Sequence, residues 1–336
     1  MLVKKLELDC DNVIIGSGLA GLTAALRLKG NTIVLSRGFG ATAISSGVLS
    51  FNARRDLPAE EWFLGSMKDT GCGYSCGNAL TDMLVHREGL VQDIMAFSDD
   101  PAIISLNGQI PPSPGFNVRG IRFLEGKSYQ EIAKLIETDP DVLRSFSQEL
   151  SGIDAGSLLI PPVLGIASSH DIRERLQKEL GASVYEYISS PSVHGMRLIQ
   201  ALRKKAMSQK NVMILDLSKA DRIVEGRVMG RTGTKAKREF HVTASNLFIA
   251  TGGPLTGLCI DGDTVYEPLT GMVISHDIEA DLNDAFLSEH KIMRKGIGAY
   301  PGMKYGFDNA RAIGAVAQGF GLYGALISGY HAGDDL

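Results

Sequence analysis

The pattern of apolar and polar residues in the first forty positions predicts a strand, a turn, a helix and a second strand. Residues 12–16, NVIIG, are apolar and β-branched, as in a parallel strand that is buried on both faces. In the next stretch the side chains of Leu19, Leu22 and Leu26 recur at helical spacing and define one broad apolar face. Residues 31–36, NTIVLS, form a second apolar strand. This pattern predicts the beginning of a nucleotide-binding α/β domain.

The regular succession of strand, helix and strand is then lost over residues 56–189. Residues 80–97 and 171–188 show helical patterns, and proline-rich loops such as QIPPSPG lie between segments of this kind. These features predict an inserted, mainly helical α+β cap domain that serves a substrate or a partner.

The pattern of a nucleotide-binding domain returns after the cap. Residues 192–207 form an amphipathic helical pattern, residues 211–231 a strand, a turn and a hairpin, and residues 238–253 an apolar strand that ends in Thr-Gly-Gly. The sequence therefore predicts an α/β fold in which residues 1–55 and 190–336 make one discontinuous domain.

Composition and charge narrow the class of protein. The 336 residues are 44% hydrophobic and 21% charged, the ordinary balance of a globular protein. A formal net charge of −4 argues against a nucleic-acid partner. The four cysteines are too few and too scattered for a disulfide framework. Cys72 and Cys76 are close enough in sequence that a redox-active pair is an alternative to two ordinary thiols. No spacing of Cys, His, Asp or Glu predicts a metal site. We expect a cytoplasmic protein, the alternative being a peripheral position at the inner face of the membrane.

One stretch near the end has the length of a membrane span. Residues 312–332 contain no Asp, Glu, Lys or Arg, and a span needs about 20 residues. The stretch is rich in Gly and Ala and contains Gln318 and Ser328, which is typical of a helix packed tightly against a cofactor or a sheet. We therefore predict no transmembrane segment.

A glycine-rich turn joins the first strand to the first helix. Gly16, Gly18 and Gly21 fit the pattern G-x-G-x-x-G. Gly16 permits the tight turn, Gly18 lets a pyrophosphate approach the backbone, and Gly21 lets helix and strand pack closely. The free N–H groups at the start of the helix then meet the phosphate charge. The turn predicts a dinucleotide site.

The second strand ends without the acid that usually follows such a turn. A carboxylate about 20 residues past the first glycine would accept hydrogen bonds from an adenosine ribose. Here that position is Ser36, which makes only one strong contact of this kind, and Arg37 beside it suits the 2′-phosphate of NADP. These residues alone leave FAD and NADP open. The hydroxyl-rich loop 38–51 and the strand and turn at 246–253 favour a larger cofactor that spans the domain.

Three segments together resemble a known family. VIIGSGLAGLTAA, SRGFGATAISSGVLSF and NLFIATGG are similar to the FAD-binding domain of the fumarate reductase and succinate dehydrogenase flavoprotein superfamily. Within it, residues 188–206 and 298–333 most resemble the B-type subunits of anaerobic glycerol-3-phosphate dehydrogenases. The resemblance implies a Rossmann-like FAD-binding domain. Members of this branch often place Ser or Thr, followed by a basic residue, where other flavoproteins carry Glu, so the resemblance favours FAD over NADP.

The resemblance also implies a set of FAD contacts spread over the chain. The backbone of Ala220 would lie beside the adenine, and Gly319, Gly321 and Leu322 would approach the isoalloxazine ring, where a helix N-terminus favours negative charge on the reduced flavin. The residues expected to bind FAD are Gly16, Ser17, Gly18, Leu19, Ala20, Gly21, Ser36, Arg37, Gly38, Thr42, Ser45, Ser46, Gly47, Ala220, Ala250, Thr251, Gly252, Gly319, Gly321 and Leu322.

Departures from the family limit what the resemblance implies. Fumarate reductases that attach FAD covalently use a His in the loop after the second strand, where this chain has Ala41, so we expect non-covalent FAD. The His-Pro-Thr-Gly type of segment that helps to bind dicarboxylates has no counterpart, which argues against succinate and fumarate as substrates. FMN, often assigned to the related B-type subunits, fits the dinucleotide turn less well than FAD.

The candidate catalytic residues follow from what flavin dehydrogenases require. Such an enzyme needs a base near the substrate hydroxyl and cations for a phosphate or carboxylate. His194 and His276 are candidate bases, whereas Arg294, Lys304 and Arg311 fall in or beside the loop expected to face the flavin. The strongest candidates are His276, Arg294 and Arg311.

Two functions of different classes are consistent with these features. In the first, the chain is a flavin-dependent dehydrogenase that oxidises a small hydroxy compound, glycerol 3-phosphate being the leading candidate. In the second, it is an electron-transfer flavoprotein subunit with no substrate site of its own, completed by a catalytic flavoprotein subunit and an iron–sulfur subunit. An NADP-dependent reductase that uses Arg37 is a third alternative.

Overall fold

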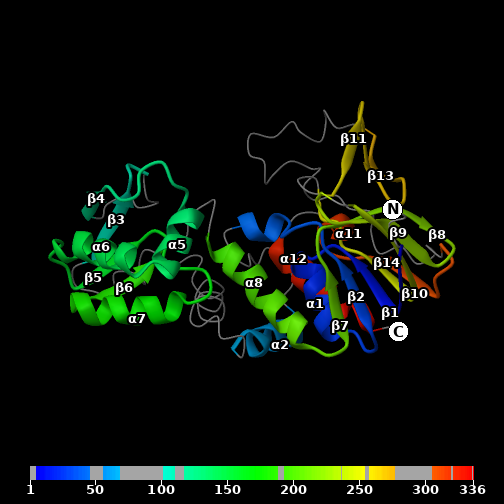
Figure 1. The fold of residues 1–336 in the computed structure, drawn as a ribbon, viewed down its shortest axis with the longest axis horizontal. Helices are drawn as coiled ribbons and strands as arrows, with labels where there is room; N and C mark the ends of the chain where they lie inside the picture. Colours follow the sequence, from blue (N-terminus) through cyan, green and yellow to red (C-terminus); the bar gives the residue numbers. More distant parts are fainter. Residues whose placement is uncertain are drawn as a thin grey trace. The chain divides into compact units, whose positions relative to one another are not determined.

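The fold is seen in a computed structural model whose described residues form two compact units (Figure 1). The first unit comprises Met1–Thr42, Ser50–Ala59 and Leu202–Leu336, and the second comprises Ala43–Leu49 and Glu60–Ala201. The structure describes residues 5–45, 56–68, 101–109, 117–187, 193–235, 237–253, 257–276, 305–318, 321–334 and 336.

A seven-stranded sheet forms the centre of the first unit (Figure 1). Its strand order is β7-β2-β1-β10-β9-β8, with β14 also paired to β10. The pairs β7–β2, β2–β1, β1–β10 and β10–β14 are parallel, whereas β10–β9 and β9–β8 are antiparallel. The strands are β1 (Leu6–Ile15), β2 (Thr32–Leu35), β7 (Val212–Leu215), β8 (Ser218–Val224), β9 (Arg227–Thr232), β10 (Arg238–Ile249) and β14 (Asn309–Ala312).

The predicted strands of this domain are confirmed, including the strand, turn and hairpin that become β7, β8 and β9. Buried residues alternate between the two faces of the sheet, since successive side chains of a strand point to opposite sides. Ile14 and Phe248 pack with Ala24 of the first helix, whereas Val13 and Ile15 belong to a separate core cluster. Because β1, β2, β7 and β10 are parallel, their carboxyl ends meet at one edge, where ligands of open α/β sheets bind.

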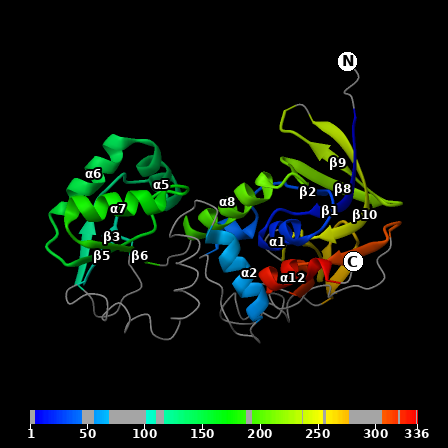
Figure 2. The same cartoon turned by 90° about the horizontal axis from the view of Figure 1, so that it is seen from below.

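Two helices of the first unit pack closely together. Figures 1 and 2 both show α12 (Leu322–Tyr330) beside α1 (Leu19–Arg27). A Cβ on Gly329 would lie 2.4 Å from the carbonyl oxygen of Ala20, so only glycine permits this approach. Part of the glycine-rich composition of 312–332 therefore serves helix packing. No helix among the described residues is both long and apolar enough to cross a bilayer.

The remaining elements that lie wholly or partly in the first unit are a small sheet and several helices. An antiparallel three-stranded sheet precedes β14 and has the order β11-β12-β13. Two longer helices, α2 and α8, each begin in one unit and end in the other. These elements are β11 (Cys259–Asp261), β12 (Thr264–Glu267), β13 (Met272–Ser275), η1 (Ala41–Ile44), α11 (Ala315–Gln318), η4 (His331–Gly333), α2 (Leu57–Lys68) and α8 (Val193–Ser208).

The second unit contains a parallel sheet of its own, in the order β4-β3-β5-β6. Its apolar core combines strand residues such as Ile104 and Leu158 with helix residues such as Ile132 and Phe146. The prediction of an inserted, mainly helical cap is therefore not confirmed, although the mixed α/β class is. The elements are β3 (Pro101–Leu106), β4 (Asn117–Ile121), α5 (Tyr129–Thr138), α6 (Pro140–Ser151), β5 (Ser157–Ile160), α7 (Ser169–Leu180) and β6 (Ser183–Glu186).

The helical pattern expected over 171–188 is correct only in its first half. Helix α7 ends at Leu180, where Gly181 adopts a left-handed conformation with φ of 64°. Strand β6 follows at once. A glycine in this conformation is a common C-terminal stop, and the Val and Tyr residues after it favour a strand. The other predicted helix, 80–97, lies outside the described residues.

Candidate functional site

The turn between β1 and α1 needs two of its three glycines for the fold itself. Gly16 has φ of 118°, and a Cβ there would lie 2.1 Å from the carbonyl oxygen of Ala250 at the end of β10. A Cβ on Gly21 would lie 2.0 Å from the carbonyl oxygen of Gly16. These distances leave no room for a side chain, so Gly16 and Gly21 allow the turn, the helix and β10 to pack.

Gly18, at the N-cap of α1, is different because the protein leaves open space beside it. Among the described residues, a Cβ there would find only the hydroxyl of Thr42 within 4 Å, at an ordinary contact distance of 3.6 Å, and φ is −75°. The N-cap makes no side-chain hydrogen bond, although the N–H of Leu19 donates to Thr42 Oγ1 over 3.1 Å. Packing alone does not require glycine at this position. A group that approaches the helix N-terminus would require it.

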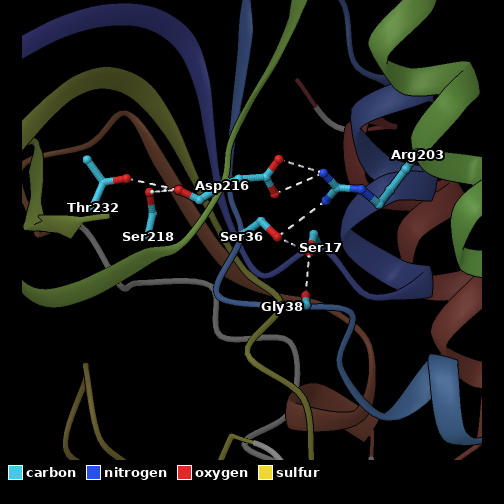
Figure 3. Close-up of polar contacts among 7 residues, drawn as sticks. All are labelled: Ser17, Ser36, Gly38, Arg203, Asp216, Ser218 and Thr232. Atoms are coloured by element: carbon cyan, nitrogen blue, oxygen red, sulfur yellow. Dashed lines mark hydrogen bonds and ion pairs between the residues drawn. The ribbon is translucent and has the colours of Figure 1, made fainter. Parts of the chain in front are cut away.

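At the end of β2, a chain of hydroxyl groups lies next to the turn (Figure 3). The hydroxyls of Ser17 and Ser36 are 2.7 Å apart, and Ser17 donates to the carbonyl oxygen of Gly38 over 2.9 Å. Both serine side chains are buried, whereas Arg37 and Gly38 are exposed. Ser36 therefore lies beside the glycine turn, as predicted, but its hydroxyl is already engaged.

The turn after β10 brings a further polar group to the same edge of the sheet. The N–H of Ala250 donates to the carbonyl oxygen of Ile15 over 2.8 Å, which joins this turn to the end of β1. The next residue, Thr251, has a buried hydroxyl oxygen that finds no hydrogen-bond partner among the described residues. A buried hydroxyl without a partner is costly, so this one fits a ligand with polar groups at this edge. Gly252 follows with φ of 98°.

The start of α12 also has open space. Gly321, its N-cap, has φ of 143°, and no atom of the described residues lies within 4 Å of a Cβ built there. Leu322 follows as the first helical residue. Ala220 lies in β8 of the same unit, next to an irregularity in its pairing with β9. The predicted contacts Ser46, Gly47 and Gly319 lie outside the described residues, as do Cys72 and Cys76.

Two of the catalytic candidates proposed from the sequence, His276 and Arg311, lie in the described part of the first unit. His276 follows β13 and is exposed, whereas Arg311 lies within β14 opposite Phe248 of β10. Arg294 and Lys304 lie outside the described residues.

The other candidate base, His194, lies buried in the second unit. Burial lowers its pKa to about 4, with the charge of Arg197 as the next cause, so the ring is neutral near pH 7. Arg197 is fully buried and makes two hydrogen bonds to the carboxylate of Glu186. Burial alone would raise the pKa of Glu186, but the charge and hydrogen bonds of Arg197 bring it below its ordinary value. These side chains form a structural ion pair.

One pair of residues beside Ser36 was missed by the sequence analysis. Asp216 directly follows β7, and Arg203 of α8 bonds both its carboxylate oxygens and the hydroxyl of Ser36 (Figure 3). The signal in the sequence is weak, because NVMILD shows only an acid at the end of one more apolar strand. The acid is important because β7 pairs with β2 in the sheet, and the spacing of residues along the chain does not reveal this pairing.

The chain belongs to the FAD binding domain family, whose match covers residues 11–276. The match confirms the predicted class, a family of FAD-binding oxidoreductase flavoproteins, and FAD as the cofactor. The described residues fit this cofactor, because they leave open space beside Gly18 and Gly321 and give the buried hydroxyl of Thr251 no partner, all within the first unit.

Individual similar proteins are more distant. Two strains of Halobacterium salinarum contain a protein described as the probable B-type subunit of anaerobic glycerol-3-phosphate dehydrogenase, 28% identical to this chain over 205 residues. The match covers 54% of this chain and 47% of the relative, so the chain matches about half the length of these curated relatives.

Two solved structures are distant matches. The E. coli quinol fumarate reductase is 14% identical over 74% of this chain and 33% of its own, with a TM-score of 0.27. The open conformation of a flavocytochrome c3 fumarate reductase is 15% identical over 73% of this chain and 34% of its own, with a TM-score of 0.29. These scores are too low to support a shared overall arrangement.

Proposed function

We propose that this chain is a flavin-dependent dehydrogenase that holds FAD non-covalently and resembles the B-type subunit of anaerobic glycerol-3-phosphate dehydrogenase. The observation that carries the proposal is the contrast at the start of α1. The fold requires glycine at Gly16 and Gly21, yet at Gly18 it leaves open the approach to the helix N-terminus. This is the arrangement that a pyrophosphate needs.

In this proposal each part of the site has one task. The N–H groups at the start of α1 hold the pyrophosphate, and the hydroxyl of Thr251 donates to the cofactor at the end of β10. The start of α12, at Gly321 and Leu322, faces the flavin ring, where its positive end favours the negative charge of the reduced cofactor. FAD, when bound, accepts the hydride from the substrate.

The substrate proposed is a small hydroxy compound with an anionic group, glycerol 3-phosphate first. His276 would act as base, and Arg294 and Arg311 would bind the anion. Residues 1–55 and 190–336 are the proposed FAD-binding domain, and residues 56–189 the domain for substrate or partner. The division of the described chain into two units supports this proposal without fixing its boundaries.

The partners and location extend the same proposal. The curated relatives are described as a subunit, which supports assembly with a catalytic flavoprotein subunit and an iron–sulfur subunit. A cytoplasmic protein, or one bound peripherally at the inner face of the membrane, is the proposed location.

A second candidate is an electron-transfer flavoprotein subunit without a substrate site. This candidate does not need His276, which follows β13, and Arg311, which lies in β14, to act on one substrate.

The experiment that tests both is anaerobic absorption spectroscopy of the purified chain. Both candidate functions predict flavin absorption bands at about 370 and 450 nm. After acid precipitation of the protein, the flavin should remain in the supernatant because it is bound non-covalently. Glycerol 3-phosphate should bleach the bands if the chain is a dehydrogenase. Bands that dithionite bleaches but glycerol 3-phosphate does not would favour the electron-transfer subunit. A chain that takes up no FAD would refute both.

A further inference from the structure

The carboxyl ends of β2 and β7 place Asp216 beside Ser36. The two strands are parallel, and their last paired residues are Leu35 and Leu215. The register continues beyond them, since the N–H of Ser36 donates to the carbonyl oxygen of Leu215 over 3.0 Å and the N–H of Ser218 donates to the carbonyl oxygen of Ser36 over 2.8 Å. Asp216 is therefore the neighbour of Ser36 across the sheet.

The carboxylate of Asp216 is held in place by Arg203. The Nη2 nitrogen of Arg203 donates to Oδ1 over 2.8 Å and to Oδ2 over 2.7 Å, and its Nη1 donates to the hydroxyl of Ser36 over 3.4 Å. Figure 3 shows Asp216 and Ser36 both directed at this guanidinium group. A single cation thus joins the acid to the end of β2.

The backbone of Asp216 is fixed as well. Its carbonyl oxygen accepts hydrogen bonds from the hydroxyls of Thr232, over 2.9 Å, and Ser218, over 3.2 Å (Figure 3). The side chain of Arg203 is 13% exposed and that of Asp216 is 54% exposed. The arginine is therefore the buried support, whereas the carboxylate presents its remaining lone pairs to the outside. A carboxylate has about four acceptor positions, so the two bonds to Arg203 leave capacity for a ligand.

We propose that Asp216 accepts the hydrogen bonds of the adenosine ribose of FAD, with Arg203 as its positioning residue. This inference rests on the proposed placement of FAD at the glycine turn. The ribose of a dinucleotide at such a turn meets the end of the second strand, where an acid usually binds its hydroxyls. Ser36 occupies that position, and its hydroxyl is 2.7 Å from that of Ser17. The acid reaches the ribose from the neighbouring strand.

The proposal also assigns the choice of nucleotide. A carboxylate only accepts hydrogen bonds, so it suits ribose hydroxyls and repels a 2′-phosphate. Arg37 suits the 2′-phosphate of NADP only if the end of the second strand is considered without Asp216, its neighbour across the sheet. With Asp216 beside that serine, the site selects a ribose that carries free hydroxyls.

The test compares ligands that differ in this one part. Asp216→Asn keeps the shape but removes the charge, and should weaken FAD binding about 10- to 100-fold, the value of a hydrogen bond to a charged group. FMN contains no adenosine, so its dissociation constant should not change. ADP should compete better than 2′-deoxy-ADP in the natural chain, and this preference should shrink in the variant. Binding is measured by flavin fluorescence.

Two further variants separate the roles. Arg203→Lys keeps a cation but has a single nitrogen, so it cannot hold the carboxylate of Asp216 and the hydroxyl of Ser36 with separate nitrogens as the guanidinium does. It should weaken FAD more than FMN, by less than Asp216→Asn. Asp141→Asn is the matched control, because Asp141 forms an exposed ion pair with Arg144 in the second unit. It should leave the binding of both flavins unchanged.

The outcomes are distinct. Equal FAD affinity in Asp216→Asn and the natural chain would overturn this inference alone, as would an equal loss for FAD and FMN. Stronger competition by adenosine 2′,5′-bisphosphate than by ADP would overturn it in favour of NADP. A natural chain that binds no FAD would overturn the proposed function together with this inference.

Discussion

Replacing Gly18 by alanine separates the needs of the cofactor from those of the fold. Within the described part of the chain, the new methyl group would meet only the hydroxyl of Thr42, at 3.6 Å. The backbone conformation of Gly18, with φ of −75° and ψ of −173°, is open to alanine. The unbound protein should therefore tolerate Gly18→Ala. The methyl group would occupy the space through which a pyrophosphate approaches the N-terminus of α1.

The magnitudes follow from these contacts. At a compatible backbone position, alanine in place of glycine changes stability by about 0.4–1 kcal/mol, in the stabilising direction. Loss of one hydrogen bond to a charged phosphate costs about 1.5–3 kcal/mol, or about 10- to 100-fold in the dissociation constant of FAD. Gly21→Ala should show the opposite behaviour, because its Cβ would lie 2.0 Å from the carbonyl oxygen of Gly16. Overpacking of this kind costs about 1–3 kcal/mol of stability.

The assay has two parts: thermal unfolding of the protein freed of flavin, and titration of the same samples with FAD. Gly18→Ala should unfold at or slightly above the temperature of the natural chain and bind FAD weakly, whereas Gly21→Ala should unfold at a lower temperature. Wild-type FAD affinity in a folded Gly18→Ala variant would refute the placement of the pyrophosphate. Equal destabilisation of the two variants would refute the argument from open space.

Two further predictions concern buried and surface charge. Arg197→Met leaves the buried carboxylate of Glu186 without its cation and should destabilise the second unit by about 3–5 kcal/mol in chemical denaturation. Arg175→Met breaks the exposed ion pair with Glu179 and should cost at most about 0.5 kcal/mol. Similar losses of stability in both variants would contradict the argument from burial. The pKa of His331 is raised above 6.5, first by its hydrogen bond with Asp334, so the stabilisation it provides is complete below pH 6.5 and is lost as the pH rises through the raised value. His331→Gln should remove this pH dependence from thermal unfolding, and an unchanged profile would contradict the assignment.

Local patterns predicted the elements of the first unit because each of them depends on neighbouring residues. The apolar segment before Gly16 could only be a buried strand, and the glycine turn after it has few other uses. The second unit was less predictable, since β5 and β6 are only four residues long and lie between or after helices. Residues 183–186 continued a helical pattern along the sequence, and the left-handed conformation of Gly181 ended it.

The candidate site was predictable to a different degree at each position. Gly16 and Gly21 could be identified from spacing, and the structure supplies the backbone contacts that exclude any side chain. The catalytic candidates could be selected only by residue type: His276 follows β13, Arg311 lies within β14, and Arg294 lies outside the described residues. Spacing identifies a turn well because the turn is local, whereas a catalytic group is defined by what it faces.

The sequence by itself determined the glycine turn and the strands and helix around it, because hydrophobic period and glycine spacing are properties of adjacent residues. The residues at the end of the second strand left FAD and NADP open, and the resemblance to the flavoprotein family favoured FAD. Only the tertiary structure placed Asp216 beside Ser36 and brought Arg203, 167 positions along the chain from that serine, within hydrogen-bonding distance of both. The physical reason is the parallel sheet, which aligns the carboxyl ends of strands that are distant in sequence.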